Sequence, residues 1–392
     1  MSQSFQIQAQ EPFNGAGMSG PATVLIRDGG IAEARLSTEV APGEAGPRVA
    51  ERFMTPGMVD IQVNGAMGMS FLDCGEAGVR RIGAELARRG TTSFLATLVT
   101  APRETMLTAV ENLAPLVGVV PGLEGLHIEG PFLNPERRGA HPPDQIRLPD
   151  WEEAEAWLKA GGGTVRVVTL APELEGGLEL VERLAGAGVT VAAGHTDATY
   201  ETMAAAVTRG LRLVTHAGNV ADWPKRVPQE TIPRLRSEPS VVGSVLALEE
   251  LACSVIGDGY HLHPALLRAL IWAKPGRVAI ISDLTALAGL GPGRYETSGL
   301  RAQITQEGIA VVPEGDFLAG SVRFQKDALA LCVGRAEIAP AAVLAALTST
   351  PARLAGLYPR KGALAPGADA DVLVWNQALE LTEVYQRGER IG

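Results

Sequence analysis

Residues 189–216 read VTVAAGHTDATYETMAAAVTRGLRLVTH, and this stretch decides the fold. An apolar run ends at His195, a helical pattern follows over residues 201–209, and a second apolar run ends at His216. Gly210 separates the helical pattern from the second run, at the place where a glycine commonly ends a helix. A strand, a helix and a second strand in this order predict one unit of a parallel sheet.

The same alternation continues on both sides of this stretch. Eight strand-like runs favour a closed α/β barrel, the (β/α)8 TIM-like fold, over an open doubly wound sheet. The predicted strands are residues 58–65, 93–99, 123–130, 165–171, 189–196, 211–218, 253–259 and 277–283. The predicted helices are residues 76–89, 103–116, 151–160, 175–187, 201–209 and 264–273, with a capping box formed by Asp150 and Glu153 at the third.

Both ends of the chain have a different pattern. Residues 5–8 and 22–35 alternate around a turn that is typical of a β-hairpin, and residues 370–375 and 380–390 also predict strands. Neither piece could bury a core alone, so we expect one small β-sandwich domain built from both termini. The predicted domains are residues 1–55 and 355–392 for the β domain and residues 56–354 for the barrel.

Two segments lie between the last barrel strand and the C-terminal strands. Residues 291–315 are polar and glycine-rich with alternating stretches, and they predict a hairpin over the mouth of the barrel. Residues 324–333, 340–349 and 351–357 predict helices that lead back to the β domain.

Composition excludes several classes of protein. The chain has 392 residues and a net charge of −10, which argues against a nucleic-acid-binding surface. The first residues have neither a basic nor an apolar signal region, and the longest apolar stretch, 241–256, is too short to span a bilayer. Cys74, Cys253 and Cys332 are widely separated, so we expect packing roles rather than disulfides. These features predict a soluble cytoplasmic protein.

Ionisable residues stand at the ends of five predicted strands, namely Glu129, His195, His216, His261 and Asp283. Because the carboxyl ends of all strands in such a barrel open onto one face, we expect these side chains to converge there. Two imidazoles and a carboxylate are sufficient protein ligands for a catalytic zinc ion. Asp283, opposite a water on that ion, could take its proton and return it to a leaving group.

Two other interpretations remain open on this pattern alone. A single histidine at a strand end is more often a hydrogen-bonded structural residue than a ligand, although five buried ionisable groups without a cation or mutual pairing are costly. Two histidines and one carboxylate also fit a non-haem iron oxygenase. Such an iron site has no need of a further acid such as Asp283, which favours hydrolysis.

Longer motifs follow one another in the same order along the chain. They are PGMVDIQVNG (56–65), HIEGPFLN (127–134), GAH (139–141), GHT (194–196), TH (215–216), DGYH (258–261), SD (282–283), LAGS (318–321) and PGADAD (366–371). On these motifs the chain, from about residue 5 to its end, closely resembles the N-acetylglucosamine-6-phosphate deacetylases of the amidohydrolase superfamily. The resemblance implies the barrel and the composite β domain inferred above.

The resemblance also implies a role for individual residues. Glu129, His195 and His216 match the ligands of the main metal site, and Asp283 matches the general base and acid. His141 matches the residue that polarises the acetamide carbonyl. The residues implied to contact the substrate are His261 at the phosphate, together with Ala140, His141, Asn219, Val220, Leu318, Ala319 and Gly320.

The first strand indicates how many metal ions to expect. Superfamily members with two metals carry two histidines where this chain has Gln62 and Asn64. Amides are weak ligands beside imidazole, so we expect one divalent metal ion, zinc or alternatively ferrous iron. His127 shares a strand face with Glu129, and we expect it to orient the ligands, whereas we expect a structural role for His263 at a helix start.

The sequence departs from the family pattern where the phosphate should bind. After its TH motif the family has an aromatic residue and a methionine, whereas residues 217–221 here read AGNVA. The family then supplies an arginine across a dimer interface, and here the basic residues are out of step by about one position. Arg226 is our candidate, with Lys225, Arg234 and Arg236 as rivals. The resemblance implies a homodimer.

Together these observations predict a metal-dependent deacetylase that hydrolyses N-acetyl-D-glucosamine 6-phosphate to D-glucosamine 6-phosphate and acetate. A deacetylase of N-acetylgalactosamine 6-phosphate or of another N-acyl amine would keep the metal residues and differ in the loops carrying Asn219, Arg226 and His261. A non-catalytic sugar-phosphate sensor is a third alternative. Asp283 argues against it, because a sensor needs no general base.

Overall fold

The largest sheet of the molecule is a parallel barrel. The computed structural model describes residues 4–17, 20–35, 48–49, 53–219, 226–228, 235–297, 300–313 and 318–391. The barrel strands are β7 (Met58–Val63), β10 (Thr91–Val99), β11 (Leu123–Glu129), β12 (Val165–Leu170), β13 (Thr190–Ala193), β14 (Leu211–Val214), β17 (Ala252–Ile256) and β18 (Val278–Ile281). They pair in the order β18-β17-β14-β13-β12-β11-β10-β7, and a bridge between Val63 and Leu284 closes the sheet.

The predicted fold class is confirmed, and so are all eight predicted barrel strands. Several strands end earlier than predicted. β13 ends at Ala193 and β14 ends at Val214, whereas the predicted strands continued to residues 196 and 218. The reason is that His195 and His216 have left-handed φ angles, which residues with a side chain do not adopt inside a β-strand.

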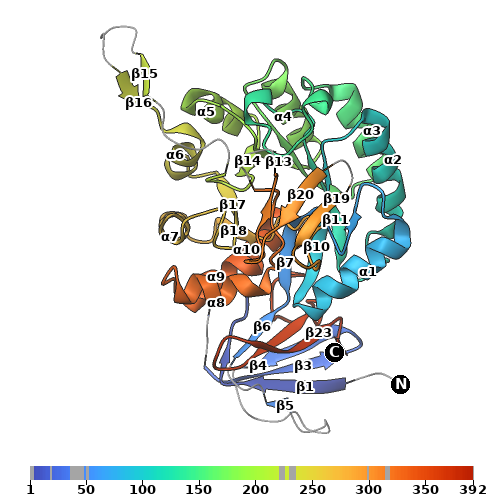
Figure 1. Cartoon of the computed structure of the whole chain (residues 1–392). Coiled ribbons are helices and arrows are strands. Elements are labelled where there is room, and N and C mark those ends of the chain that lie inside the picture. The colour runs from blue at the N-terminus through green and yellow to red at the C-terminus, as the bar shows by residue number, and fades with distance from the viewer. Residues whose placement is uncertain are drawn as a thin grey trace.

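Helices surround the outside of the barrel (Figure 1). They are α1 (Gly75–Arg88), α2 (Arg103–Leu113), α3 (Trp151–Gly161), α4 (Gly177–Gly186), α5 (Tyr200–Thr208), α6 (Ser240–Ala247), α7 (Pro264–Ala273), α8 (Lys326–Gly334), α9 (Pro340–Leu347) and α10 (Ser349–Leu354). Within the described part of the chain, none of them combines the length and the apolar composition that a bilayer-spanning helix requires.

Helix α6 was missed by the sequence reasoning. The apolar stretch 241–256 has no polar face that would reveal a helical period, and the structure divides it into α6 and strand β17. The exposed Glu249 and Glu250 lie between the two elements.

The start of α3 shows half of the expected capping box. Asp150 accepts hydrogen bonds from the backbone N–H groups of Glu152 and Glu153, as an N-cap residue should. The side chain of Glu153 does not return to the cap. It is buried and pairs with Arg147 and Arg103 at 2.5 and 3.3 Å.

Strands from both ends of the chain form two sheets beside the barrel. Their strands are β1 (Ser4–Ala9), β2 (Glu11–Pro12), β3 (Ala22–Arg27), β4 (Gly30–Arg35), β5 (Arg48–Val49), β6 (Phe53–Pro56), β22 (Val372–Trp375), β23 (Leu381–Gln386) and β24 (Glu389–Arg390). One sheet has the order β4-β3-β1-β5 and the other β2-β6-β22-β23-β24, so β6 pairs directly with β22. Ile7 and Val24 from the first sheet pack with Met54 and Val374 from the second. The composite β-sandwich is therefore present, and the domain boundaries at residues 55 and 354 stay a prediction.

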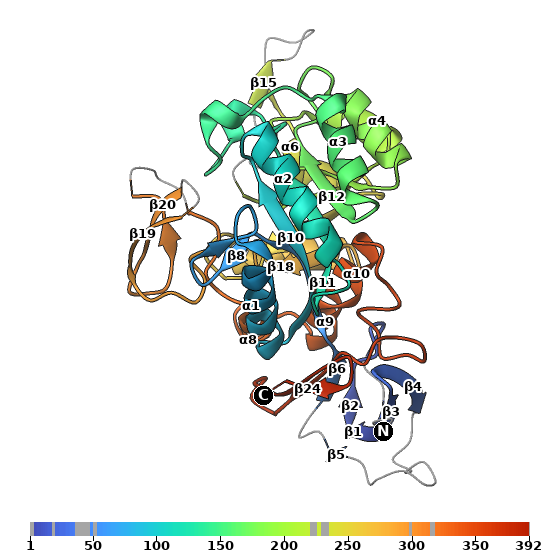
Figure 2. The same ribbon diagram turned by 90° about the vertical axis from the view of Figure 1, so that its right-hand side faces the viewer.

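Short hairpins decorate the loops. The predicted hairpin after the last barrel strand is present as β19 (Gly293–Thr297), β20 (Leu300–Ile304) and the short β21 (Ala310–Val311), and Figure 2 shows it projecting to one side of the barrel. Two more two-stranded hairpins are β8 (Gly65–Ala66) with β9 (Met69–Ser70), and β15 (Arg226–Pro228) with β16 (Leu235–Ser237).

A buried ion-pair network joins the barrel to the terminal sheets. Lys361, which is 2% exposed, lies with its Nζ atom 2.7 Å from Asp371, 2.9 Å from Asp369 and 3.3 Å from Glu124. Glu124 belongs to β11, whereas Asp371 directly precedes β22. Arg360, which is partly exposed, pairs with Glu124 and Asp369 on the outer side.

The seam of the barrel contains a buried carboxyl group. Asp60 of β7 accepts hydrogen bonds from the backbone N–H of Ser282 at 3.1 Å and from that of Gln62 at 3.2 Å. Asp60 therefore bridges the first and last strands just below the end of the barrel. Burial raises its pKa from the ordinary 3.8 to about 7.

This raised pKa of Asp60 predicts a pH dependence of stability. Between about pH 4 and pH 7 the unfolded chain ionises Asp60 while the native protein keeps it protonated, so the free energy of unfolding should fall as the pH rises. Asp60→Asn should remove that part of the decline, and urea titrations of the chelator-treated protein at pH 5 and pH 8 would measure it. Asp327→Asn, at a partly exposed position, is the control; parallel pH curves for wild type and Asp60→Asn would contradict the prediction.

Candidate metal centre and active site

Three of the predicted site residues are each the second residue after a barrel strand, and they have a left-handed backbone conformation. The φ angles are 50° at His195 after β13, 33° at His216 after β14 and 50° at Asp283 after β18. Residues other than glycine rarely adopt such angles, and they do so where the surrounding structure imposes them. Strained residues at three strand ends on one face of the barrel mark this face as a candidate functional site.

Glu129, His195 and His216 meet at one point. His216 Nε2 lies 3.0 Å from Glu129 Oε1 and 3.1 Å from His195 Nε2, and His195 Nε2 lies 3.4 Å from the same Glu129 oxygen. The ligand nitrogen and oxygen atoms of a tetrahedral zinc site lie about 3.3 Å apart, because each is about 2.0–2.1 Å from the metal. The three atoms are therefore spaced as the ligands of one small cation would be.

The hydrogen bonds of His195 favour this interpretation. Its Nδ1 lies 2.9 Å from the backbone carbonyl oxygen of Arg137, which can only accept, so Nδ1 carries the hydrogen. In the neutral ring with this tautomer, Nε2 carries the lone pair that a cation between His195, Glu129 and His216 would need. Burial alone would raise the pKa of Glu129, but the neighbouring His195 and His216 hold it well below the ordinary value. The His195 nitrogen and the Glu129 carboxylate face each other, and a cation between them would bind both.

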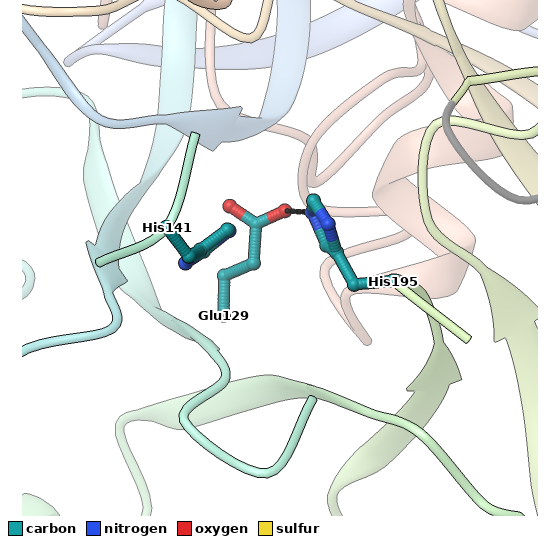
Figure 3. A group of neighbouring side chains, drawn as sticks. All are labelled: Glu129, His141 and His195. Carbon is teal, nitrogen blue, oxygen red and sulfur yellow. Dashed lines mark ion pairs between the residues drawn. The ribbon is translucent and has the colours of Figure 1, made fainter. Parts of the chain in front are cut away.

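His141 lies against the same carboxylate (Figure 3). Glu129, His141 and His195 form a buried group that could hold a metal ion, with ligand atoms all within 4.8 Å of one another. The His141 ring lies edge-on to that of His195, with centroids 4.5 Å apart, and its Nδ1 lies 2.8 Å from Thr100 Oγ1. Burial lowers the pKa of His141 to about 3, so the ring is neutral. The structure thus places His141 near enough to Glu129 and His195 to act on a ligand bound beside them.

Two amides organise the carboxylates of the site. Gln62 Nε2 donates to Glu129 Oε1 at 3.0 Å and to Asp283 Oδ1 at 3.1 Å. Asn64 Nδ2 donates to the same Asp283 oxygen at 2.9 Å. Both amides therefore present N–H groups at the place where two-metal members of the superfamily have ligands. N–H groups repel cations, which fits a site for one metal ion.

Asp283 is suited to proton transfer near neutral pH. Burial, together with the negative charge of Glu129, raises its pKa to about 6. The two amides fix one of its oxygens, Oδ1, and leave Oδ2 without a side-chain donor among the residues that the structure describes. A carboxyl group with a pKa close to the working pH is an efficient general base and acid.

These residues line one cavity of about 780 Å³. A cavity of this size accommodates a small-molecule ligand. Of the predicted site residues, it is lined by Glu129, Ala140, His141, His195, His216, Asn219, His261, Asp283, Leu318, Ala319 and Gly320. The structure therefore brings most of the predicted site together.

Val220 and the basic candidates for the phosphate clamp are not placed in this way. Val220, Lys225 and Arg234 lie outside the described residues, and for Arg226 and Arg236 only the backbone is described, in β15 and β16. Their roles stay predictions.

Sequence reasoning missed other cavity residues. Arg138 lines the cavity from the loop before His141, and Glu296 and Arg301 line it from the β19–β20 hairpin, where they form an ion pair at 3.3 Å. Loop residues carry no periodic signal. Only Arg138 had a sequence feature that could have indicated it, namely its position directly before the GAH motif at Gly139.

His261 is held by its own turn. Asp258 Oδ2 lies 2.7 Å from His261 Nδ1, and Asp258 Oδ1 accepts from the backbone N–H groups of Tyr260 and His261. A carboxylate can only accept, so His261 Nδ1 carries a hydrogen, and the residue lines the cavity.

His127 lies deeper in the barrel than expected for a residue that orients ligands directly. Its Nδ1 lies 3.0 Å from the carbonyl oxygen of Ile61, and its Nε2 lies 2.8 Å from Thr169 Oγ1. Burial lowers the pKa of His127 to about 4. The ring therefore links β7, β11 and β12. His263 caps α7 by accepting from the N–H of Ala265, so its structural role is confirmed.

Comparison with known proteins agrees with this geometry. Residues 53–390 match the model of the amidohydrolase family. N-acetylglucosamine-6-phosphate deacetylase from Bos taurus is 32% identical over 353 residues, which cover 86% of this chain and 83% of that protein. N-acetylgalactosamine-6-phosphate deacetylase from Escherichia coli O157:H7 is 30% identical, with 93% of each protein covered.

A solved structure extends the likeness to three dimensions. An aspartate-to-alanine mutant of N-acetyl-D-glucosamine-6-phosphate deacetylase from Mycobacterium smegmatis, in complex with N-acetyl-D-glucosamine-6-phosphate, superposes with a TM-score of 0.89. It is 30% identical, and the match covers 99% of both chains. The chain therefore belongs to the amidohydrolase family and is a hydrolase of carbon–nitrogen bonds.

Proposed function

We propose that this enzyme hydrolyses the acetamide of N-acetyl-D-glucosamine 6-phosphate to D-glucosamine 6-phosphate and acetate. The observation that carries the proposal is the arrangement of Asp283 in the same cavity as the group of Glu129, His195 and His216, whose ligand atoms lie 3.0–3.4 Å apart. The relatives named above support the substrate, since they include N-acetylglucosamine-6-phosphate deacetylases.

Glu129, His195 and His216 would hold one divalent cation, for which we propose zinc, with ferrous iron as the alternative for this donor set. When bound, the cation supplies Lewis acidity towards the acetamide carbonyl and the attacking water. The amide N–H groups of Gln62 and Asn64 support a single-metal site, because nitrogens that donate hydrogen bonds to the carboxylates do not ligate a second cation.

Asp283 would carry the proton through the reaction. Its Oδ2 takes a proton from the attacking water while Gln62 and Asn64 hold Oδ1. The carboxyl group then gives this proton to the sugar nitrogen, so that an amine leaves in place of a poor amide anion.

His141 would polarise the carbonyl by donating a hydrogen bond from Nε2. Its Nδ1 must then accept, and Thr100 Oγ1 at 2.8 Å is the donor that this tautomer needs. The neutral ring is suited to this role, because a cationic ring would repel the metal ion.

The sugar phosphate would lie at the edge of the cavity near His261, with backbone groups of Asn219 and Val220 and the Leu318–Gly320 segment along the sugar. Arg226 stays our candidate for the cationic clamp, supplied by the partner in a homodimer. Free thiols at Cys74, Cys253 and Cys332 fit a reducing, cytoplasmic location.

One experiment tests both the metal and the substrate. We expect the purified enzyme to contain about one equivalent of zinc or iron by elemental analysis and to release acetate from N-acetylglucosamine 6-phosphate. Chelator treatment should abolish acetate release, and adding back Zn²⁺ or Fe²⁺ should restore it, because the cation activates carbonyl and water. A mock-treated sample is the control.

The same assay separates the alternatives. Faster acetate release from N-acetylgalactosamine 6-phosphate would favour the second candidate, which the relative from Escherichia coli supports. Binding of either sugar phosphate without acetate release by the metal-loaded protein would instead indicate a sensor and overturn the proposal.

A further inference from the structure

Glu173 lies outside the residues that the proposed mechanism uses, yet it joins three loops of the site. It follows β12 in the sequence, and its Oε1 accepts from the backbone N–H of Asp197 at 2.6 Å and from Asn134 Nδ2 at 2.9 Å. Its Oε2 accepts from the hydroxyl group of the buried Thr196. One carboxylate therefore binds the loop after β11, which carries Asn134, and the loop after β13, which carries His195.

Both the backbone and the side chain of His195 are held by the loop after β11. The carbonyl oxygen of His195 accepts from the backbone N–H of Asn134 at 3.0 Å, and its Nδ1 donates to the carbonyl of Arg137 at 2.9 Å. Arg137 in turn pairs with Asp197 at 3.0 Å. Glu173 thus holds Thr196 and Asp197, the two residues after His195. Through Asn134 it also holds the loop whose Arg137 carbonyl accepts the His195 Nδ1 hydrogen.

His195 needs such a hold, because its φ angle is 50°. A left-handed conformation is unfavourable for a residue with a side chain, so it persists only where neighbouring bonds impose it. Without that hold, the backbone at His195 could relax and carry the imidazole away from Glu129 and His216.

We propose that Glu173 is a positioning residue for His195, and that it holds the imidazole Nε2 where a divalent cation binds. This inference rests on the proposed metal site at Glu129, His195 and His216. Partners that orient metal ligands commonly change metal affinity by about 10–100-fold when they are removed. The loss of Glu173 should therefore weaken cation binding more than it alters the fold.

The test measures the affinity for Zn²⁺ alone, by competition with a chromophoric chelator at a temperature far below unfolding. Glu173→Ala should bind Zn²⁺ about 10–100-fold more weakly than wild type. Glu173→Gln, which keeps one acceptor oxygen, should lie between the two. Glu175→Gln, the same change at an exposed residue two positions further, should bind as wild type does.

A second readout separates positioning from a general loss of stability. The visible spectrum of the Co²⁺-substituted protein reports ligand geometry, and it should change in Glu173→Ala and stay unchanged in Glu175→Gln. Excess Zn²⁺ should restore much of the acetate release of Glu173→Ala, which a misfolded variant would not regain. If Glu173→Ala does not fold, Thr196→Val and Glu173→Gln replace it in the test. Each should then bind Zn²⁺ at least about threefold more weakly than wild type.

The outcomes are distinguishable. Zn²⁺ affinity and Co²⁺ spectra equal to wild type in a folded Glu173→Ala variant would overturn the role of Glu173 and leave the metal site intact. A wild-type protein that binds no stoichiometric Zn²⁺ would overturn the proposed metal site itself, and with it this inference.

Discussion

Replacing Asp283 with asparagine should lower the turnover number by about 10²- to 10⁴-fold, the range that a general acid–base group typically contributes. The amide oxygen of asparagine can still accept from Gln62 Nε2 and Asn64 Nδ2, which lie 3.1 and 2.9 Å from Asp283 Oδ1. The side chain should therefore stay in place while it loses the ability to take a proton from water. Acetate release under substrate saturation measures the effect.

Two controls accompany the Asp283→Asn variant. Its metal content should equal that of wild type, because the three proposed ligands are unchanged. Asp327→Asn, the same chemical change at a partly exposed helix position outside the site, should leave the turnover number unchanged. Activity of Asp283→Asn within about threefold of wild type, well short of the usual acid–base contribution, would remove Asp283 from the mechanism.

Replacing Lys361 with methionine should lower the free energy of unfolding by about 3–5 kcal/mol, as is usual when one partner of a buried ion pair is removed. Methionine fills a similar volume, but it leaves Glu124, Asp369 and Asp371 close together without the ammonium group between them. The loss of stability should therefore come from uncompensated charge rather than from a cavity. Urea unfolding followed by fluorescence measures the difference.

Arg360→Met is the matched control within the same network. Arg360 pairs with Glu124 and Asp369, but its side chain is 45% exposed, and exposed ion pairs contribute only about 0–1 kcal/mol. If the two variants lose the same free energy of unfolding, the burial of Lys361 does not make its ion pairs stronger than those of Arg360. A loss below about 1 kcal/mol for Lys361→Met would contradict the stabilising role of the network.

The barrel could be predicted because its strands and helices differ in hydrophobic period. The convergence of Glu129, His195, His216 and Asp283 followed from closure alone, since the carboxyl ends of parallel strands share one face. The left-handed backbone at three of these positions could not be predicted. It results from tertiary hydrogen bonds, such as that of the His195 carbonyl with Asn134, which leave no periodic trace in the sequence.

Other features escaped prediction for related reasons. Helix α6 has no polar stripe, so its apolar residues could not be divided from those of β17 by pattern alone. Glu153 stands at the spacing of a capping box, but the nearby Arg147 and Arg103 offer its carboxylate better partners than a backbone N–H. Glu173 gave no signal, because a single carboxylate after a strand becomes informative only when the loops around it are in place.

The pairing of β6 with β22 has a consequence for how the chain is made. On the ribosome, β6 emerges long before its partner β22, so at about 5–20 residues per second the nascent strand waits on the order of tens of seconds. Throughout that interval Phe53 and Met54, which are buried in the finished protein, lack the strand that covers them. An unpaired apolar edge of this kind is prone to aggregation. Biosynthesis of this enzyme should therefore depend on chaperones that shield the emerging N-terminal strands.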